Sequence, residues 1–124
     1  MTTPLSPNLD EAPIASLATQ QLAAYNAHDV DAFVACYHPE VQVLNHRGED
    51  QVVGIAAFRE QYTRLFASFD RIEAHVSHRL VLGDHIVERE CWSRQTKQGE
   101  AQRGDVLVRY TLRDGLIGYV EFLR

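Results

Sequence analysis

The sequence is poor in lysine and holds no long apolar run. Its 124 residues include one lysine against eleven arginines, and the formal net charge is −5. A nucleic-acid-binding protein needs a basic stripe that meets phosphates, whereas these arginines are scattered from Arg47 to Arg124. A membrane-spanning helix needs roughly 18 consecutive apolar residues, and no run approaches that length. We therefore expect neither nucleic acid nor a membrane as a partner.

Cysteine is also scarce, and the N-terminus has none of the features of a secretory signal. Cys36 and Cys91 lie far apart and outside any C-x-x-C spacing. The first residues carry neither a basic start nor an apolar stretch. These observations predict a cytoplasmic protein with free thiols that pack as small apolar groups.

Motifs for metal and cofactor chemistry are absent. His75 and His78 would point to opposite faces of a strand, so they do not form a chelating pair. No glycine-rich phosphate loop, G-x-S-x-G motif or Cys–His nucleophile pattern occurs. We expect no metal and no cofactor.

What is present suits one small domain. Apolar residues make up 45% of the chain and charged residues 23%. Residues 1–12 contain proline breaks and little to bury, which predicts a flexible N-terminal arm. Residues 13–124 are expected to form a single domain with one core.

The apolar periodicity divides this domain into helices followed by strands. Spacings of three and four predict helices over 14–25, over 29–38 with Asp29 as N-cap, and over 55–69. Alternation predicts a short strand over 41–45, a loop over 46–54, and four long strands over 71–82, 85–95, 105–112 and 116–124. This order indicates an α+β fold with the helices on one face of an antiparallel sheet.

One strand places carboxylates on an otherwise apolar face. In the stretch IVERECWS, the alternate residues Ile86, Glu88, Glu90 and Trp92 share one side. A buried carboxylate is costly unless it is paired, hydrated or neutralised. The face is therefore predicted to line a concave, partly wet pocket. Glu88, nearer the turn, is expected to reach solvent at the rim or to meet an arginine.

The preceding turn decides which residues accompany Glu90. Gly83 suits the third position of a three-residue loop, which pairs even-numbered residues with even-numbered ones and adds His78 to the same face. A two-residue turn would place leucines beside Arg89, so we reject it on burial grounds. The apolar face of the next strand, Val106 to Leu112, is expected to extend the pocket wall.

Several stretches resemble the nuclear transport factor 2-like superfamily, and its SnoaL-like branch in particular. They are AYNAHDVDAFVACYHPEVQV, GIAAFREQYTRLFASF, LGDHIVERE and YTLRDGLIGYVEF. The resemblance implies a cone-shaped curved antiparallel sheet wrapped around three N-terminal helices, with a pocket at its open end, and homodimers formed through the outer sheet face. Members include ketosteroid isomerases, polyketide cyclases, dehydratases and scaffold proteins, so the fold does not select a function.

The comparison with the isomerases can be made residue by residue. That branch uses a tyrosine in the first helix, an aspartate at the end of the first strand and a protonated aspartate in the penultimate strand. By alignment these places fall on Gln21, Asn45 and Val108. Neither amide is a base and valine cannot donate a hydrogen bond, so steroid isomerisation by that route is not expected.

Two functions remain open from the sequence. The first is a homodimer that binds a small, largely apolar molecule with polar groups and transfers a proton through Glu90, assisted by His78. The second is a non-catalytic ligand-binding or accessory module, in which Glu90 is sealed by an arginine or a tyrosine and His78 is a wall residue. The expected ligand-contacting residues are Trp92, Tyr110, Asn45, Val108 and Tyr25. Asn45 could equally cap its strand. The spacing of Tyr25 on its helix favours a place in the core over a ligand contact.

Overall fold

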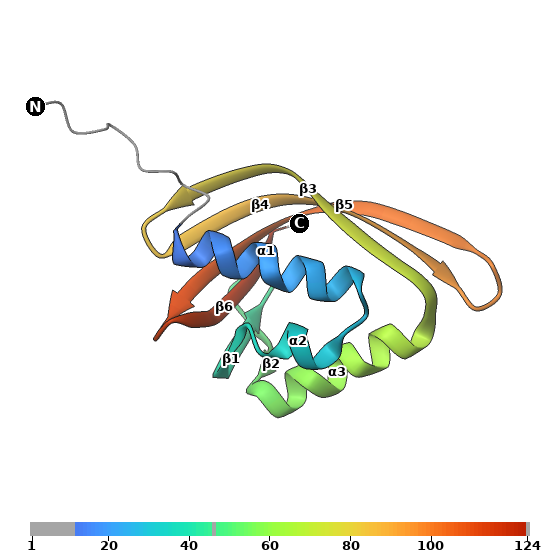
Figure 1. The fold of residues 1–124 in the computed structure, drawn as a ribbon, viewed down its shortest axis with the longest axis horizontal. Coiled ribbons are helices and arrows are strands. Elements are labelled where there is room, and N and C mark those ends of the chain that lie inside the picture. Colours follow the sequence, from blue (N-terminus) through green and yellow to red (C-terminus); the bar gives the residue numbers. More distant parts are fainter. Residues whose placement is uncertain (1–11, 46, 124) are drawn as a thin grey trace, which may run out of the picture.

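Three helices lie beneath one face of a curved, six-stranded sheet in the computed structural model, which describes residues 12–45 and 47–123 (Figure 1). The helices are α1 (Pro13–Asn26), α2 (Val30–Val34) and α3 (Ile55–Ser68). The strands are β1 (Tyr37–Leu44), β2 (Asp50–Val53), β3 (Phe69–Leu82), β4 (His85–Thr96), β5 (Ala101–Arg113) and β6 (Leu116–Leu123). The predicted α+β class is confirmed. Residues 1–11 of the predicted arm lie outside the described residues.

The sheet is mixed, with the order β2-β1-β6-β5-β4-β3. Strands β3 to β6 form an antiparallel meander, as predicted, but β1 pairs with β6 in parallel. Strand β2, helix α3 and strands β3 to β5 separate β1 from β6 along the chain, and β6 runs in the same direction as β1. The two ends of the sheet do not meet, so the cone is open (Figure 1).

The first half of the domain differs from the sequence prediction in two places. Helix α2 begins as expected, with the Asp29 side chain accepting a hydrogen bond from Ala32 N at 3.1 Å, but it ends at Val34 and Tyr37 already belongs to β1. Pro39 lies in a part of β1 where pairing with β6 is interrupted, which suits a residue without an N–H. The predicted loop over 46–54 contains the short strand β2, which pairs with β1. Its four residues are too few to show an alternation in sequence.

Because of a β-bulge at Ser77, the residues of β3 after Val76 point to the side of the sheet opposite to the one predicted. Val76 lies opposite Glu90, and His78 lies opposite Arg89, so Ser77 is an extra residue in its strand. The turn that follows has two residues, between the paired Leu82 and His85. The three-residue loop and the even-with-even register beyond Val76 were therefore wrong.

The reversal moves one arginine inward and two leucines outward. Arg79 now faces the same side as Glu88. Leu80 and Leu82 are 72% and 79% exposed on the outer side. The register between β4 and β5 is the predicted one, with Glu90 opposite Val106 and Glu88 opposite Val108.

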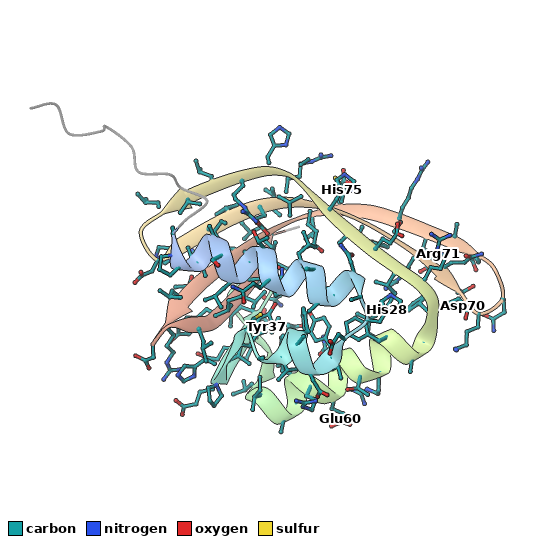
Figure 2. All side chains as sticks on the ribbon, viewed as in Figure 1. His28, Tyr37, Glu60, Asp70, Arg71 and His75 are labelled. Carbon is teal, nitrogen blue, oxygen red and sulfur yellow. The ribbon has the colours of Figure 1, made fainter. Side chains whose placement is uncertain are left out.

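The core between helices and sheet is rich in aromatic rings. Phe33 of α2 is 1% exposed and lies at its centre. Its ring contacts those of Tyr25, Tyr37, Phe58, Tyr62 and Phe66, with centroids 4.6 to 6.1 Å apart. Tyr37 lies between the sheet and the helices, whereas His75 stands on the opposite side of the sheet (Figure 2). Within 12–45 and 47–123, no helix has the length and apolar character needed to cross a membrane.

Candidate functional site

Glu90 lies on the inner face of β4 and lines a small internal cavity. The cavity has a volume of about 30 Å³, which leaves room for roughly one or two water molecules. Its walls come from α1, from the α2–β1 segment, from α3 and from the sheet. They are Gln21, Leu22, Tyr25, Phe33, Tyr37, Tyr62, Glu90, Tyr110, Val120 and Phe122.

The surroundings of the Glu90 carboxyl raise its pKa and give it no hydrogen-bond or ion-pair partner among the described residues. Burial, followed by the nearby charge of Glu88, raises the pKa of Glu90 from 4.5 to about 7. No residue in the described part of the chain forms a hydrogen bond or ion pair with this side chain. Near neutral pH the group is therefore poised between acid and base, the condition under which a carboxyl can both take and return a proton.

A hydrogen-bond chain fixes the tyrosines on one side of the cavity. The Tyr37 hydroxyl donates to Gln21 Oε1 at 2.9 Å, and Gln21 Nε2 lies 3.2 Å from the Tyr110 hydroxyl and 3.1 Å from the Ala18 carbonyl. Since Gln21 Nε2 is a donor, the Tyr110 oxygen accepts and its own proton stays available for the cavity.

The cavity tyrosines remain protonated at physiological pH. Burial, with Glu90 as a further cause, raises the pKa of Tyr25 to about 12 and the pKa values of Tyr62, Tyr37 and Tyr110 well above their ordinary range. Each hydroxyl therefore stays neutral. That of Tyr37 donates to Gln21, whereas that of Tyr110 is left as a donor suited to a carbonyl oxygen or to a developing negative charge.

Glu88, two residues before Glu90 on the same face, has a different environment. Its side chain is fully buried, and Arg79 Nε and Nη2 lie 2.7 and 2.6 Å from Oε2. Oε1 has no hydrogen-bond partner among the described residues. Burial outweighs the arginine and raises the pKa of Glu88. Of the two outcomes expected for Glu88, the arginine pair is observed, and it makes Glu88 a structural group.

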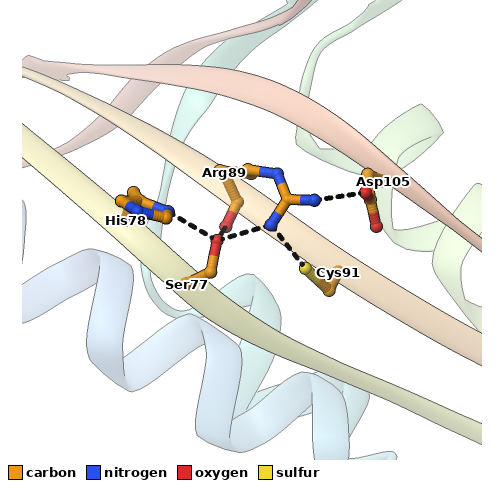
Figure 3. A network of polar contacts seen from close by, with 5 residues as sticks. All are labelled: Ser77, His78, Arg89, Cys91 and Asp105. Atoms are coloured by element: carbon orange, nitrogen blue, oxygen red, sulfur yellow. Dashed lines mark hydrogen bonds and ion pairs between the residues drawn. The ribbon is translucent and has the colours of Figure 1, made fainter.

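His78 does not lie beside Glu90. Because of the Ser77 bulge it is exposed on the outer face, where its Nδ1 lies 2.9 Å from Ser77 Oγ. Figure 3 shows the network there, in which Arg89 contacts Ser77, Cys91 and Asp105. The predicted pairing of His78 with Glu90 was wrong.

The five residues predicted to contact a ligand lie in different parts of the structure, and only two of them line the cavity. Tyr25 and Tyr110 line the cavity. Trp92 follows Glu90 on the inner face and lies over Gly104, where an added Cβ would come within 2.7 Å of the indole. Val108 is fully buried opposite Glu88. Asn45 Oδ1 accepts hydrogen bonds from two backbone N–H groups of the β1–β2 turn, so it caps its strand.

Sequence reasoning missed three residues of the Glu90 cavity and one farther along β4. Tyr37 and Tyr62 were not predicted as site residues, because apolar spacing does not reveal that a tyrosine faces a cavity, and Gln21 was considered only as a replacement for a tyrosine. Arg94 could have been found, since it continues the alternation Glu90, Trp92, Arg94 on β4. Across the described ranges, no three His, Cys, Asp or Glu side chains gather as a metal site, and the expected absence of a metal stays a prediction.

The sequence matches the profile of a known protein family. The profile of the family described as SnoaL-like domain matches residues 18–120. No curated protein matches the sequence significantly.

Solved structures share the fold over nearly the whole chain. An uncharacterized cystatin fold protein from Novosphingobium aromaticivorans has 26% identity and a TM-score of 0.82, covering 91% of this chain and 98% of its own. A Mycobacterium tuberculosis protein in complex with estradiol-17beta-hemisuccinate has 15% identity and a TM-score of 0.81, covering 92% and 95%. A protein with a ketosteroid isomerase-like fold from Catenulispora acidiphila, in complex with trimethylamine, has 13% identity and a TM-score of 0.74, covering 86% and 82%.

Proposed function

This chain belongs to the SnoaL-like domain family, and we propose that it binds the polar group of a small, largely apolar molecule beside Glu90 and transfers a proton there. The ligands of two structures with this fold, estradiol-17beta-hemisuccinate and trimethylamine, are small molecules and support such a use of the fold.

Two glutamates on the same face of β4 differ in their partners, and this difference is the main support for the proposal. Glu88 is paired with Arg79, whereas Glu90 has no partner among the described residues and faces a cavity. A buried carboxyl with only a structural role would be expected to have a hydrogen-bond or ion-pair partner, as Glu88 has in Arg79. A carboxyl with a pKa near 7 in a cavity is suited to acid–base chemistry.

The reaction follows from the groups around the cavity. Ionised Glu90 removes a proton from a carbon next to a carbonyl, and the electron pair moves to the carbonyl oxygen. The Tyr110 hydroxyl, which accepts from Gln21, donates to this oxygen as its negative charge develops. Protonated Glu90 then gives the proton to another carbon in an isomerisation, to the alkoxide formed when the enolate carbon attacks a second carbonyl in a cyclisation, or to the hydroxyl group that leaves as water in a dehydration.

The size of the cavity favours a second candidate, a binding or accessory module without chemistry. Pockets for drug-sized ligands typically have about 300 to 1,000 Å³, and this one has about 30 Å³. A reacting carbonyl group fits that space, while the apolar body of its molecule would lie outside it.

Deuterium exchange separates the two candidates without knowledge of the natural substrate. Small ketones with an exchangeable α-carbon are incubated with the protein in D₂O and followed by proton NMR. Wild type should accelerate exchange, and Glu90→Gln should lower the rate by about 10²- to 10⁴-fold. The control Glu60→Gln changes an exposed carboxylate of α3 that pairs with Arg64, and it should exchange like wild type. Binding without Glu90-dependent exchange would instead support the accessory module.

A further inference from the structure

Arg94 continues the line of inner-face residues that begins at Glu90. Glu90, Trp92 and Arg94 are successive inward positions of β4, so Glu90 and Arg94 lie about 13 Å apart along the strand. The Arg94 guanidinium is held in place by its surroundings. It stacks 4.4 Å from the Phe69 ring centroid and 5.0 Å from that of Trp92, and its Nε donates to Gln102 Oε1 at 2.7 Å.

The positive charge of Arg94 lacks a carboxylate partner among the described residues. Eight of the ten arginines in 12–45 and 47–123 pair with a carboxylate, and the other two are Arg94 and Arg103. Arg103 is exposed on the outer face of β5, whereas Arg94 is half-buried on the inner face. The two terminal amino groups of Arg94 are thus available donors on a guanidinium whose position is already fixed.

Arg94 is also linked to the Glu90 cavity through Tyr25. The pKa of Tyr25, a cavity residue, is raised by Glu90 and lowered by Arg94. The Tyr25 hydroxyl therefore lies within electrostatic reach of both groups.

We propose that Arg94 binds a carboxylate of the ligand, so that the molecule acted on at Glu90 is a small keto acid with an apolar body between its two polar ends. This inference rests on the proposed function for the role of Glu90 and adds the charge of the substrate. Arg94 offers the planar pair of donors that matches a carboxylate. The Trp92 indole lies between the two polar ends and supplies an apolar surface for the body of the ligand. Placing the carboxylate at Arg94 also keeps it away from the Glu90 charge.

The test uses a matched pair of probes, 3-(4-acetylphenyl)propanoate and its neutral amide, in which a phenyl ring lies between the ketone and the carboxylate or amide. Binding is followed by the fluorescence of Trp92, the only tryptophan, and α-carbon exchange by NMR in D₂O. Wild type should bind the acid about tenfold or more tightly than the amide, and added salt should reduce this preference. Arg94→Gln should abolish the preference, and Arg94→Lys, which keeps the charge and checks that the fold tolerates change here, should retain part of it. Arg103→Gln is the matched control and should behave like wild type.

Equal affinities for acid and amide, no measurable binding of the acid, or a preference that survives Arg94→Gln would each overturn the inference. Glu90→Gln separates this inference from the proposed function. An Arg94-dependent preference with no Glu90-dependent exchange would support the carboxylate site while the proton transfer fails. Exchange at equal rates for acid and amide would overturn the carboxylate site while the proton transfer stands.

Discussion

Glu88 and Glu90 show how two identical side chains acquire different roles within one strand. They are separated by one residue and share the inner face of β4. Glu88 meets Arg79 because the bulge in β3 brings that arginine inward, whereas Glu90 lies opposite Val76 and Val106, which offer it no partner. The energetic consequences of the two carboxyls can therefore be measured separately, through the arginine partner for Glu88 and through the carboxyl itself for Glu90.

The raised pKa of Glu90 predicts that stability falls as pH rises through a defined window. Between pH 4.5 and about 7 the folded protein holds the Glu90 proton and the unfolded chain has lost it. The unfolded state then binds fewer protons, so the free energy of unfolding decreases with pH, by about 3 kcal/mol across the window. Glu90→Gln should fold normally and lose this part of the pH dependence in denaturant titrations from pH 4 to 8. The same slope in both proteins would contradict the assignment.

The Glu88–Arg79 pair predicts a large loss of stability on removal of the arginine. Arg79→Ala leaves a fully buried carboxylate uncompensated, which should cost about 3–5 kcal/mol in chemical unfolding, with a larger loss at high pH where Glu88 must ionise. The control is Arg71→Ala, which removes an exposed pair with Glu73 and should cost less than about 1 kcal/mol. Equal losses for the two variants would show that the buried pair is not structural.

At the scale of the elements, the Ser77 bulge determines what the inner face contains. If the same residues paired without a bulge, Ser77 would lie opposite Arg89, and the alternation would place His78 inward and Arg79 outward. With the bulge, Arg79 reaches Glu88, and Leu80 and Leu82 reach the outer surface.

Insertion of one alanine between His78 and Arg79 should therefore destabilise the domain much more than deletion of Ser77. The insertion places the new residue opposite Glu88, moves Arg79 to the outer face and leaves Glu88 buried alone, so the melting temperature should fall sharply. Deletion of Ser77 removes the extra residue but keeps His78 opposite Arg89 and Arg79 opposite Glu88, so its melting temperature should stay near that of wild type. Similar melting temperatures for both variants would show that the facing of Arg79 does not govern the stability of this region.

The bulge also marks the limit of what the sequence could predict. The alternation of β4 and β5 was strong enough to predict their buried face and the position of Glu90 on it. The bulge has no such signal, because Ser77 is neither glycine nor proline and both of its flanking segments alternate well. The predicted His78 partner failed for this reason. Tyr37 and Tyr62 were missed because helical spacing cannot distinguish a core tyrosine from one that faces a cavity.

At the scale of the whole molecule, the two faces of the sheet differ in how they are covered. The helices cover the inner face and leave the outer face of β3, β4 and β5 open (Figure 1). A hollow of about 610 Å³ is lined mainly by outer-face residues of these strands, which are Glu73, His75, Cys91, Ser93, Arg103 and Asp105. Exposed apolar side chains, Leu80, Leu82 and Leu107, lie on this side. Apolar and charged groups mixed in this way are typical of a protein interface.

We therefore predict a homodimer through the outer face. The expected contact residues are Val87, Arg89, Cys91, Leu107, Arg109 and Thr111. Light scattering should give twice the chain mass of 14.1 kDa. Leu107→Asp should yield monomers, because it places a charge on the apolar part of the face, where Leu107 is 44% exposed. Val53→Asp changes a 58% exposed apolar residue on β2 and should remain dimeric. A wild-type monomer at micromolar concentration would contradict the prediction.

Glu90 has a pKa near neutrality and faces a cavity lined by tyrosine hydroxyls. An NMR titration of the protein labelled with ¹³C at the glutamate side-chain carboxyl measures this pKa, with the Glu90 signal assigned by comparison with Glu90→Gln. We predict a midpoint at about pH 7 for this signal, well above the ordinary glutamate pKa of about 4.3. A Glu90 midpoint between pH 4 and 5 would instead show that the carboxyl is ionised and solvated at neutral pH, and that Glu90 is not the acid–base group proposed.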